Sequence, residues 1–367
     1  MPGRLPRVLR GKLLPPAMAI VFSALLCTVA LLISAGSPGT ALAAMVSQVG
    51  KGTTAVDILN SATIYYLIGV AVAIGFKMNL FNIGVEGQYR IGAVTGAIVG
   101  GATNLPPVLE PLLVILSAVA AGALYAALPA ILKVTRGVSE VITTIMLNAV
   151  SIGILALLIN EKTFGVLVNN NIATKPIPQS GWIPGVSFGS HGTLFGFVVV
   201  AIAVGIAYWV MLNRSRFGFE LRASGESPTA AMAGGVNAKR MIVVAMLLSG
   251  ATAGLTALPE LLGRDHVYTQ LSPQGYGFTG IAVALLGRNN PGGIAFGALL
   301  WAFLDQSAVS LDNVGVPKEI VTIMQGAIVL SVVVSYEVIR RFELAAEQRR
   351  VGAQLGTATV AAAGGAS

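Results

Sequence analysis

The chain has 367 residues, of which 55% are hydrophobic and only 10% are charged. A soluble domain usually carries about 25% charged residues, so this composition excludes a soluble globular protein. Several apolar runs reach about 20 residues, the length that crosses a bilayer as a helix, whereas barrel strands would alternate apolar and polar side chains. We therefore predict an all-α polytopic membrane protein, and the location of its net charge of +8 must then be explained.

The first apolar run, near residues 17–35, follows a basic N-terminal stretch that contains Arg4, Arg7, Arg10 and Lys12. The residues Ala41 to Ala43 resemble a signal-peptide cleavage site. The run is at the long end for a signal core, so an uncleaved first transmembrane helix is the preferred interpretation. A cleaved signal would leave nine membrane segments in place of ten.

The hydropathy pattern predicts ten membrane segments. They lie near residues 17–35, 57–76, 88–103, 111–132, 138–160, 194–212, 241–260, 276–287, 291–308 and 319–338. The third, eighth and ninth segments are short for a full crossing, so we expect them to be tilted, broken or re-entrant. Such segments are tolerated at membrane depth only against protein or a water-filled cavity.

Small residues recur at helical spacing in these segments. Gly92, Gly96 and Gly100 are four apart, as are Gly250 with Gly254 and Gly293 with Gly297. Faces of this kind let helix backbones approach closely in a membrane, so we expect a tightly packed bundle there.

Placing the N-terminus in the cytoplasm puts only Lys51, Lys162, Lys175, Arg264 and Lys318 outside, out of 23 Lys and Arg residues. This asymmetry follows the positive-inside rule and accounts for the net charge without a nucleic-acid partner. Residues 1–340 then form the membrane domain, with a cytoplasmic loop at 213–240. The tail 341–367, rich in Ala, Gly and Thr, is predicted to be cytoplasmic and disordered. The outer loop 161–193 is expected to be a short ordered cap, although its Trp182 also suits an interfacial anchor.

The stretch FNIGVEGQYRIGA, residues 81–93, places polar side chains between two apolar segments. Asn82, Glu86 and Gln88 are candidates for lining a transport pathway, because polar groups inside a membrane bundle usually face a cavity or a partner. The alternative is structural, since an acid just before a helix can cap its free N–H groups. Both interpretations stay open at this point.

A second polar stripe lies on the fifth segment. Glu140, Thr143, Thr144 and Asn148 share one helical face, which should point inward because lipid would penalise it. The threonine hydroxyls can also bond back to their own helix. Glu140, Thr144 and Asn148 are therefore candidate pathway residues, with Asn148 the best placed to contact a hydroxyl-rich ligand.

The eighth segment begins with Tyr276 and Phe278 among glycines. An aromatic face there could stack on a nucleobase, at about 1–3 kcal/mol per base. Aromatic residues at a membrane interface are also ordinary belt residues. Both are kept as candidate substrate contacts.

The cytoplasmic loop holds a compact helix signature. Ser227 suits an N-cap, Pro228 the first helical position, and Gly234 with Gly235 a stop. A helix this short would be only marginally stable alone in water, so we expect it to dock against a partner. Its small residues would let the partner surface come close. The alternative is a surface loop with an incidental helix. The residues expected to make the coupling contact are Glu226, Ser227, Pro228, Ala230, Ala231 and Gly234.

Four blocks resemble the permeases of ABC importers for branched-chain amino acids, simple sugars and nucleosides. The coupling block is LRASGESPTAAMAGGVNAKR followed by LLSGATAGLTALPELLG, and the others are GFKMNLFNIGVEGQYRIGA, SEVITTIMLN and GYGFTGIAVALLGRNNPGGIAFGALL. Together they cover roughly residues 57–335 and are closest to the nucleoside branch. The resemblance implies a multi-pass permease in the cytoplasmic membrane, surrounded by lipid, with both termini in the cytoplasm. It also places the Asn82–Gln88 block near the translocation pathway.

The resemblance further implies three partners: a cytoplasmic ABC ATPase, a second homologous permease and an extracellular substrate-binding lipoprotein. No cofactor is expected on this chain. The sequence lacks G-x-x-x-x-G-K-[ST], so ATP and Mg²⁺ would bind the partner ATPase, and this chain would not be an enzyme. Alternatives are import of sugars or branched-chain amino acids by the same class, or an ion-coupled secondary transporter. The position of the acids, mostly at segment ends, disfavours a proton relay. An intramembrane enzyme ranks last, because no nucleophile with a histidine base is visible.

Overall fold

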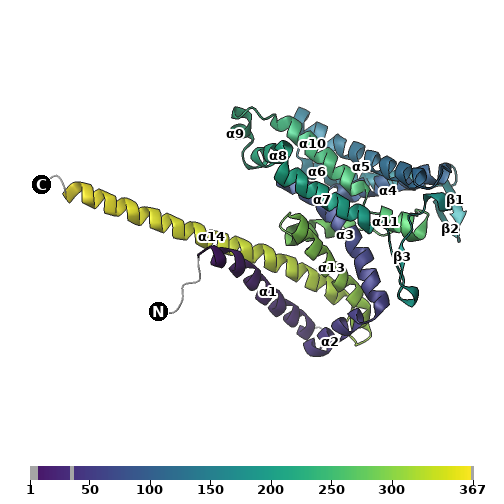
Figure 1. Cartoon of the computed structure of the whole chain (residues 1–367), viewed down its shortest axis with the longest axis horizontal. Coiled ribbons are helices and arrows are strands. Elements are labelled where there is room, and N and C mark those ends of the chain that lie inside the picture. Colours follow the sequence, from purple (N-terminus) through teal and green to yellow (C-terminus); the bar gives the residue numbers. More distant parts are fainter. Residues whose placement is uncertain (1–6, 34–36, 365–367) are drawn as a thin grey trace. The chain divides into compact units, whose positions relative to one another are not determined.

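The computed structural model describes residues 7–33 and 37–364, and almost all of the elements in these ranges are α-helices (Figure 1). The chain forms two compact units, which divide at residues 45/46 and 307/308. In the first unit, α1 (Arg7–Ile33) lies alongside α14 (Glu319–Gly364). Helix α14 continues to Gly364, whereas the composition predicted a disordered tail. The tail is rich in alanine, the strongest helix former, and has no proline to stop the helix.

Seven helices in the described ranges are long and apolar enough to cross a membrane. They are Pro16–Ile33, Gly52–Lys77, Leu109–Arg136, Glu140–Leu158, Ala238–Asp265, Pro291–Asp312 and Glu319–Phe342. An eighth is possible if Val198–Arg214 and Arg216–Glu226, bent by 72°, form one broken span. Each of the ten predicted segments coincides with a helix, but three of those helices are short or bent, so ten is an approximate count of crossings.

The second unit is built around α3 (Gly52–Lys77), in which 17 of the 26 residues are buried. Helices α4 (Val85–Ala102), α5 (Leu109–Arg136), α6 (Glu140–Leu158) and α10 (Ala238–Gly254) pack beside one another (Figure 1). A Cβ atom added to Gly92 would lie 2.7 Å from the Cα of Gly254. The predicted close packing through small residues is therefore confirmed for α4 and α10.

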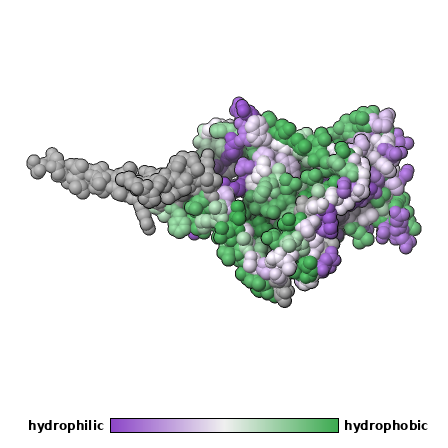
Figure 2. Space-filling view, turned by 60° about the horizontal axis from the view of Figure 1, so that its bottom comes forward, coloured by the Kyte–Doolittle hydropathy of each residue, from purple (hydrophilic) through white to green (hydrophobic). Residues whose placement is uncertain are grey.

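One end of this unit carries the short strands and is called the strand end. The hairpin of β1 (Gly165–Val168) and β2 (Asn171–Thr174) pairs Gly165 with Thr174, and β3 (Val186–Ser187) pairs with β4 (Thr193–Leu194). Two 3₁₀ turns, η1 (Gln179–Gly181) and η2 (Gly189–His191), complete this cap. Figure 2 shows hydrophilic side chains gathered at this end of the molecule, beyond a broad apolar surface.

The cap is bonded to the segment that follows α10. This segment contains α11 (Leu258–Glu260) and the π-helical turn η3 (Leu261–Asp265). The Ile177 amide donates to the His266 carbonyl at 2.9 Å, and the Ile183 amide donates to the Leu262 carbonyl at 3.0 Å. The rings of Trp182 and His266 stack at 3.8 Å. Trp182 is thus part of an ordered cap.

The opposite end, called the α9 end, is formed by α7 (Val198–Arg214), α8 (Arg216–Glu226) and α9 (Pro228–Ala233) (Figure 1). Helices α12 (Tyr276–Leu286) and α13 (Pro291–Asp312) follow later in the chain. Helix α2 (Pro38–Val49) and helix α8 have no counterpart among the predicted segments, because neither is long and apolar enough to stand out in hydropathy.

Candidate functional site

The polar stretch FNIGVEGQYRIGA forms a helix break inside the bundle. Helix α3 ends at Lys77, Asn79 adopts a left-handed backbone with φ of 59°, and α4 begins at Val85. The Leu80 amide folds back to the Gly75 carbonyl at 3.0 Å. The non-helical residues 78–84 therefore turn back along α3. Met78, Leu80, Asn82 and Gly84 are buried, whereas Asn79 and Phe81 are exposed.

Helix α4 begins beside the middle part of α3, not beside one of its ends. On α12, Gly277 packs against Glu86 at the start of α4, and Gly280 packs against Ile68 of α3. Ile68 is about 24 Å along α3 from Gly52 and about 14 Å from Lys77, at about 1.5 Å per residue. Helices α4 and α12 thus both begin within the bundle, which is what their short predicted lengths indicated.

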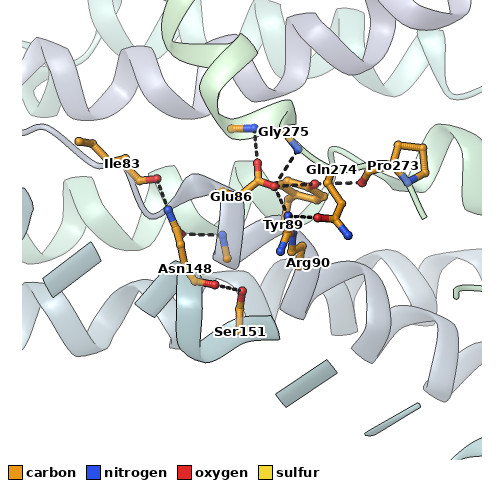
Figure 3. Close-up of polar contacts among 11 residues, drawn as sticks. Ile83, Glu86, Tyr89, Arg90, Asn148, Ser151, Pro273, Gln274 and Gly275 are labelled. Carbon is orange, nitrogen blue, oxygen red and sulfur yellow. Dashed lines mark hydrogen bonds and ion pairs between the residues drawn. The ribbon is translucent and has the colours of Figure 1, made fainter. Parts of the chain in front are cut away.

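Glu86 receives four hydrogen-bond donors and is only 3% exposed. Its carboxylate accepts from the Gly277 amide at 2.7 Å and from the Gly275 amide at 2.8 Å (Figure 3). It also accepts from the Arg90 guanidinium at 2.6 Å and from the Tyr89 hydroxyl at 3.2 Å. Glu86 therefore caps α12, a helix nearly 190 residues further along the chain, where a negative charge also suits the helix dipole.

Arg90 balances the charge of Glu86 inside the bundle. It is 6% exposed, and its second contact is the side-chain oxygen of Gln274 at 3.2 Å. The charge count placed Arg90 at the cytoplasmic face. The structure shows instead that Arg90 is buried and forms an ion pair with Glu86, one helical turn before it on α4. The pair lies within α4, and breaking it would leave an unpaired charge away from water. The bonds of Glu86 to the Gly275 and Gly277 amides, and of Arg90 to Gln274, fix α4 to the start of α12.

Asn82 and Gln88 form a reciprocal amide pair. The Asn82 amide donates to Gln88 at 2.9 Å, and the Gln88 amide donates back at 3.0 Å. Asn82 also donates to the Ser249 hydroxyl on α10 at 2.8 Å, and that hydroxyl donates to the Ala71 carbonyl at 2.6 Å. The pair thus joins the helix break to α3, α4 and α10, with each of the two amides 1% exposed.

The polar stripe on α6 supports the same break from the other side. Asn148 donates to the Ile83 carbonyl at 3.0 Å and accepts from the Gly87 amide at 2.9 Å (Figure 3). The Thr144 hydroxyl bonds back to the Glu140 carbonyl at 2.6 Å, and Glu140 forms an ion pair with Lys133. Asn148 therefore belongs with Glu86 and Gln88, whereas Glu140 ties α6 to α5.

We call the connected group Asn82, Glu86, Gln88, Arg90, Asn148 and Ser249 the polar seam. It links α3, α4, α6, α10 and α12 through side chains that bond to one another and to backbone groups of these elements. The sequence pattern identified four of its members as candidates. It missed Ser249 and the role of Arg90, although the spacing of Glu86 and Arg90 suits an ion pair on one helix.

Tyr276 and Phe278 do not form one aromatic face. Tyr276 packs against Tyr89, with ring centroids 5.6 Å apart, and against Tyr65 at 6.0 Å. Its hydroxyl donates to Glu260 at 2.9 Å. Phe278 is 60% exposed, because residues two apart on a helix point to opposite sides. Tyr276 alone therefore belongs to the interior beside the polar seam.

The predicted helix in the loop 213–240 is present as α9. Ser227 caps it by accepting from the Ala230 amide at 3.3 Å, Pro228 is its first residue and Gly234 follows its end. Ala230 and Glu226 are exposed, and Ala231 is buried at 6% exposure. The pattern missed Met232, an apolar side chain that is 55% exposed on this helix.

Helix α9 is connected at both of its ends to the region of the polar seam. Before it, Gly225 of α8 lies directly on the end of α3, so that an added Cβ would be 2.8 Å from the Lys77 carbonyl oxygen. After it, α10 begins at Ala238 and carries Ser249 of the seam. Helices α8 and α10 thus connect α9 to the end of α3 and to the seam.

Within residues 7–33 and 37–364, no group of three or more His, Cys, Asp or Glu side chains is placed to hold a metal ion. The side chains of the polar seam form their hydrogen bonds with one another and with nearby backbone groups of this chain. Its arrangement joins the ends of several helices at one place in the bundle.

The helices of membrane-crossing length in the described ranges, with a break between α3 and α4 and a half-length α12, define a multi-pass membrane protein. Comparison with known proteins supports this class: residues 54–333 match the family described as the branched-chain amino acid transport system / permease component, and the chain belongs to that family. It is a permease subunit of an ABC transporter.

Several curated relatives are similar over most of their length. The guanosine ABC transporter permease protein NupP of Bacillus subtilis is 33% identical, with 89% of this chain and 94% of the relative covered. The nucleoside ABC transporter permease protein NupB of Lactococcus lactis is 30% identical, with 89% and 92% covered. The glucose ABC transporter permease protein TsgB13 of Haloferax volcanii is 33% identical, with 78% of each chain covered. No solved structure matches the chain.

Proposed function

We propose that this chain is the permease subunit of an ATP-driven importer of nucleosides. The observation that carries the proposal is its similarity, over nine-tenths of its length, to permeases named for guanosine and nucleosides. A second candidate is sugar import, which the similarity to a glucose permease favours over a shorter part of the chain.

The proposed assembly has four kinds of subunit. An ABC ATPase docks on α9 and hydrolyses ATP with Mg²⁺, since this sequence has no phosphate-binding loop of its own. A second homologous permease completes the pathway, and an extracellular lipoprotein delivers the substrate. The α9 end and both termini then face the cytoplasm, in agreement with the positive-inside rule.

We propose that coupling runs from α9 to the polar seam. Glu226, Ser227, Pro228, Ala230 and Gly234, with Met232, would meet the ATPase, whereas Ala231, also expected at this contact, is buried. Ala231 faces inward, so a push on the exposed side of α9 is passed to the elements beneath it. The contact of Gly225 with α3 and the bond of Ser249 to Asn82 carry that push to the helix break.

The polar seam would then reshape the pathway as a unit. Asn82, Glu86, Gln88 and Asn148 hold the starts of α4 and α12, so a shift of the break moves the inner ends of both helices. Thr144 and Glu140 steady α6 against this motion. Polar groups at this depth are costly in a membrane and are retained mainly at functional sites.

The function is tested by uptake into proteoliposomes that contain the whole complex. Labelled uridine, guanosine, ribose, glucose and leucine are each supplied with the binding lipoprotein and with ATP on the cytoplasmic side. We expect the nucleosides to accumulate and leucine not to. Accumulation of glucose or ribose, with no nucleoside uptake, would favour the sugar branch and contradict the proposal.

A further inference from the structure

A polar cavity of about 600 Å³ lies toward the strand end of the second unit. Its wall is formed by Asp57, Asn60 and Ser61 on α3, by Glu260 at the end of α11 and Arg264 in η3, and by Gln306 on α13. Another hollow of the same unit, about 510 Å³ beside α7, is lined mainly by apolar side chains such as Leu59 and Trp209. The polar cavity falls within the roughly 300–1,000 Å³ that small-molecule sites usually occupy.

Some of the polar groups in this wall are already used to build it. The Asn60 side chain donates to the Thr193 carbonyl at 3.0 Å and accepts from the Phe195 amide at 2.9 Å. The Gln306 amide donates to the Ser61 hydroxyl at 3.2 Å. These bonds fix the cavity wall, because they join α3 to β4 and to α13.

The two carboxylates of the wall differ in their bonds. Glu260 accepts from Arg264 and from Tyr276, both at 2.9 Å, which leaves one acceptor site on each oxygen. Asp57 is exposed and forms no hydrogen bond or ion pair with the described part of the chain. The cavity therefore offers carboxylate oxygens that can accept further hydrogen bonds.

The chemistry of the wall suits a neutral ligand that carries several hydroxyl groups. Two carboxylates against the single guanidinium of Arg264 would repel a phosphate, so nucleotides are disfavoured. An aliphatic amino-acid side chain would leave the polar wall without partners. Vicinal hydroxyls, in contrast, can donate to a carboxylate in pairs, and hydrogen bonds to charged groups are the stronger ones.

The cavity is also connected to the polar seam. Tyr276 is bonded to Glu260 at one side of the cavity and begins the helix whose first amides are capped by Glu86. A ligand that hydrogen-bonds to Glu260 and displaces its carboxylate would disturb the hydrogen bond that the Tyr276 hydroxyl donates to Glu260. Occupation of the cavity can thus be felt at the start of α12.

We propose that this cavity is a substrate subsite in which Asp57 and Glu260 accept the ribose hydroxyls of a nucleoside during its passage. The proposal rests on the proposed function and adds to it the site and the part of the ligand that is recognised. Asp57 is the more telling of the two residues, because its replacement disturbs no bond of the structure.

The test uses the complete complex in proteoliposomes, with the binding lipoprotein and substrate both saturating. Turnover is measured for uridine and for 2′,3′-dideoxyuridine, which lacks both ribose hydroxyls. We expect Asp57→Ala to slow uridine about tenfold, as the loss of a hydrogen bond to a charged group would, and dideoxyuridine less than about twofold. Glu161→Ala, an exposed carboxylate outside the cavity, is the matched control and should alter neither rate.

A variant that slows both substrates equally, or neither, overturns the subsite. If Asp57→Ala does not assemble, Asp57→Asn keeps the volume and one acceptor oxygen, and we expect it to slow uridine by about threefold with dideoxyuridine unaffected. An equal effect on both substrates in that variant also overturns it. A wild-type complex that imports no nucleoside refutes the proposed function, whereas uptake with unchanged selectivity refutes only the subsite.

Discussion

Replacing Glu86, the carboxylate of the polar seam, with alanine should destabilise the protein strongly. The substitution removes the acceptor of four donors, two of which are the backbone amides of Gly275 and Gly277. In membrane bundles such bonds contribute about 0.6 kcal/mol each, or about 2.4 kcal/mol together. The buried Arg90 would also lose its counter-charge, which raises the expected loss toward about 3–5 kcal/mol.

The assay is equilibrium unfolding of the purified chain in mixed micelles, followed by tryptophan fluorescence. We expect Glu86→Ala to lower the free energy of unfolding by about 2–5 kcal/mol. Glu161→Ala, which removes an exposed carboxylate, should change it by less than about 0.5 kcal/mol. Equal stabilities of the Glu86 and Glu161 variants would refute the role of Glu86 as the cap of α12. The double variant with Arg90→Met should lose less than the two single losses combined, since no charge is then left unpaired.

Three further predictions concern α9, its contact with α3 and the cap at the strand end. Gly225→Ala should lower the free energy of unfolding by about 1–3 kcal/mol and slow uptake, because the new methyl group would meet the backbone at the end of α3. Gly153→Ala, whose methyl group would enter open space, serves as the control. Equal effects of the two substitutions would contradict the contact of Gly225 with α3. Ala230→Glu should abolish ATP-driven uptake while the protein stays in the membrane, as radioactive uptake and membrane fractionation would show; full uptake would end the docking interpretation. Burial lowers the pKa of His266, so the stabilisation from its neutral ring is complete above about pH 6.5 and is lost as the pH falls through the lowered pKa. The fluorescence of the stacked Trp182 should report that step, and the same step in His266→Gln would contradict it.

The sequence predicted the helices, α9 included, because their signals are local. Each of the ten predicted segments coincides with a helix, although only seven or eight are of membrane-crossing length, and the capping residues Ser227 and Pro228 placed α9 correctly. Glycine spacing likewise indicated where α4 and α10 approach each other. Each of these features depends on residues within a few turns of one another.

The partners of the polar seam could not be predicted, because they depend on contacts between distant segments. Glu86 was recognised as a possible helix cap, but the sequence pointed to the helix that follows it and not to α12. The pairing of Asn82 with Ser249 joins positions 167 residues apart. The cavity beside Asp57 was missed for the same reason, since its wall comes from α3, β4, α11, η3 and α13.

The central claim is that an ATPase acting on α9 drives a nucleoside through this permease. The most direct test is labelled uridine uptake into proteoliposomes that hold either the full complex or this chain alone. The account predicts accumulation only with the full complex and hydrolysable ATP, and no flux through the chain alone under an ion gradient. Uridine accumulation by the isolated chain, driven by an ion gradient without any ATPase, would contradict it.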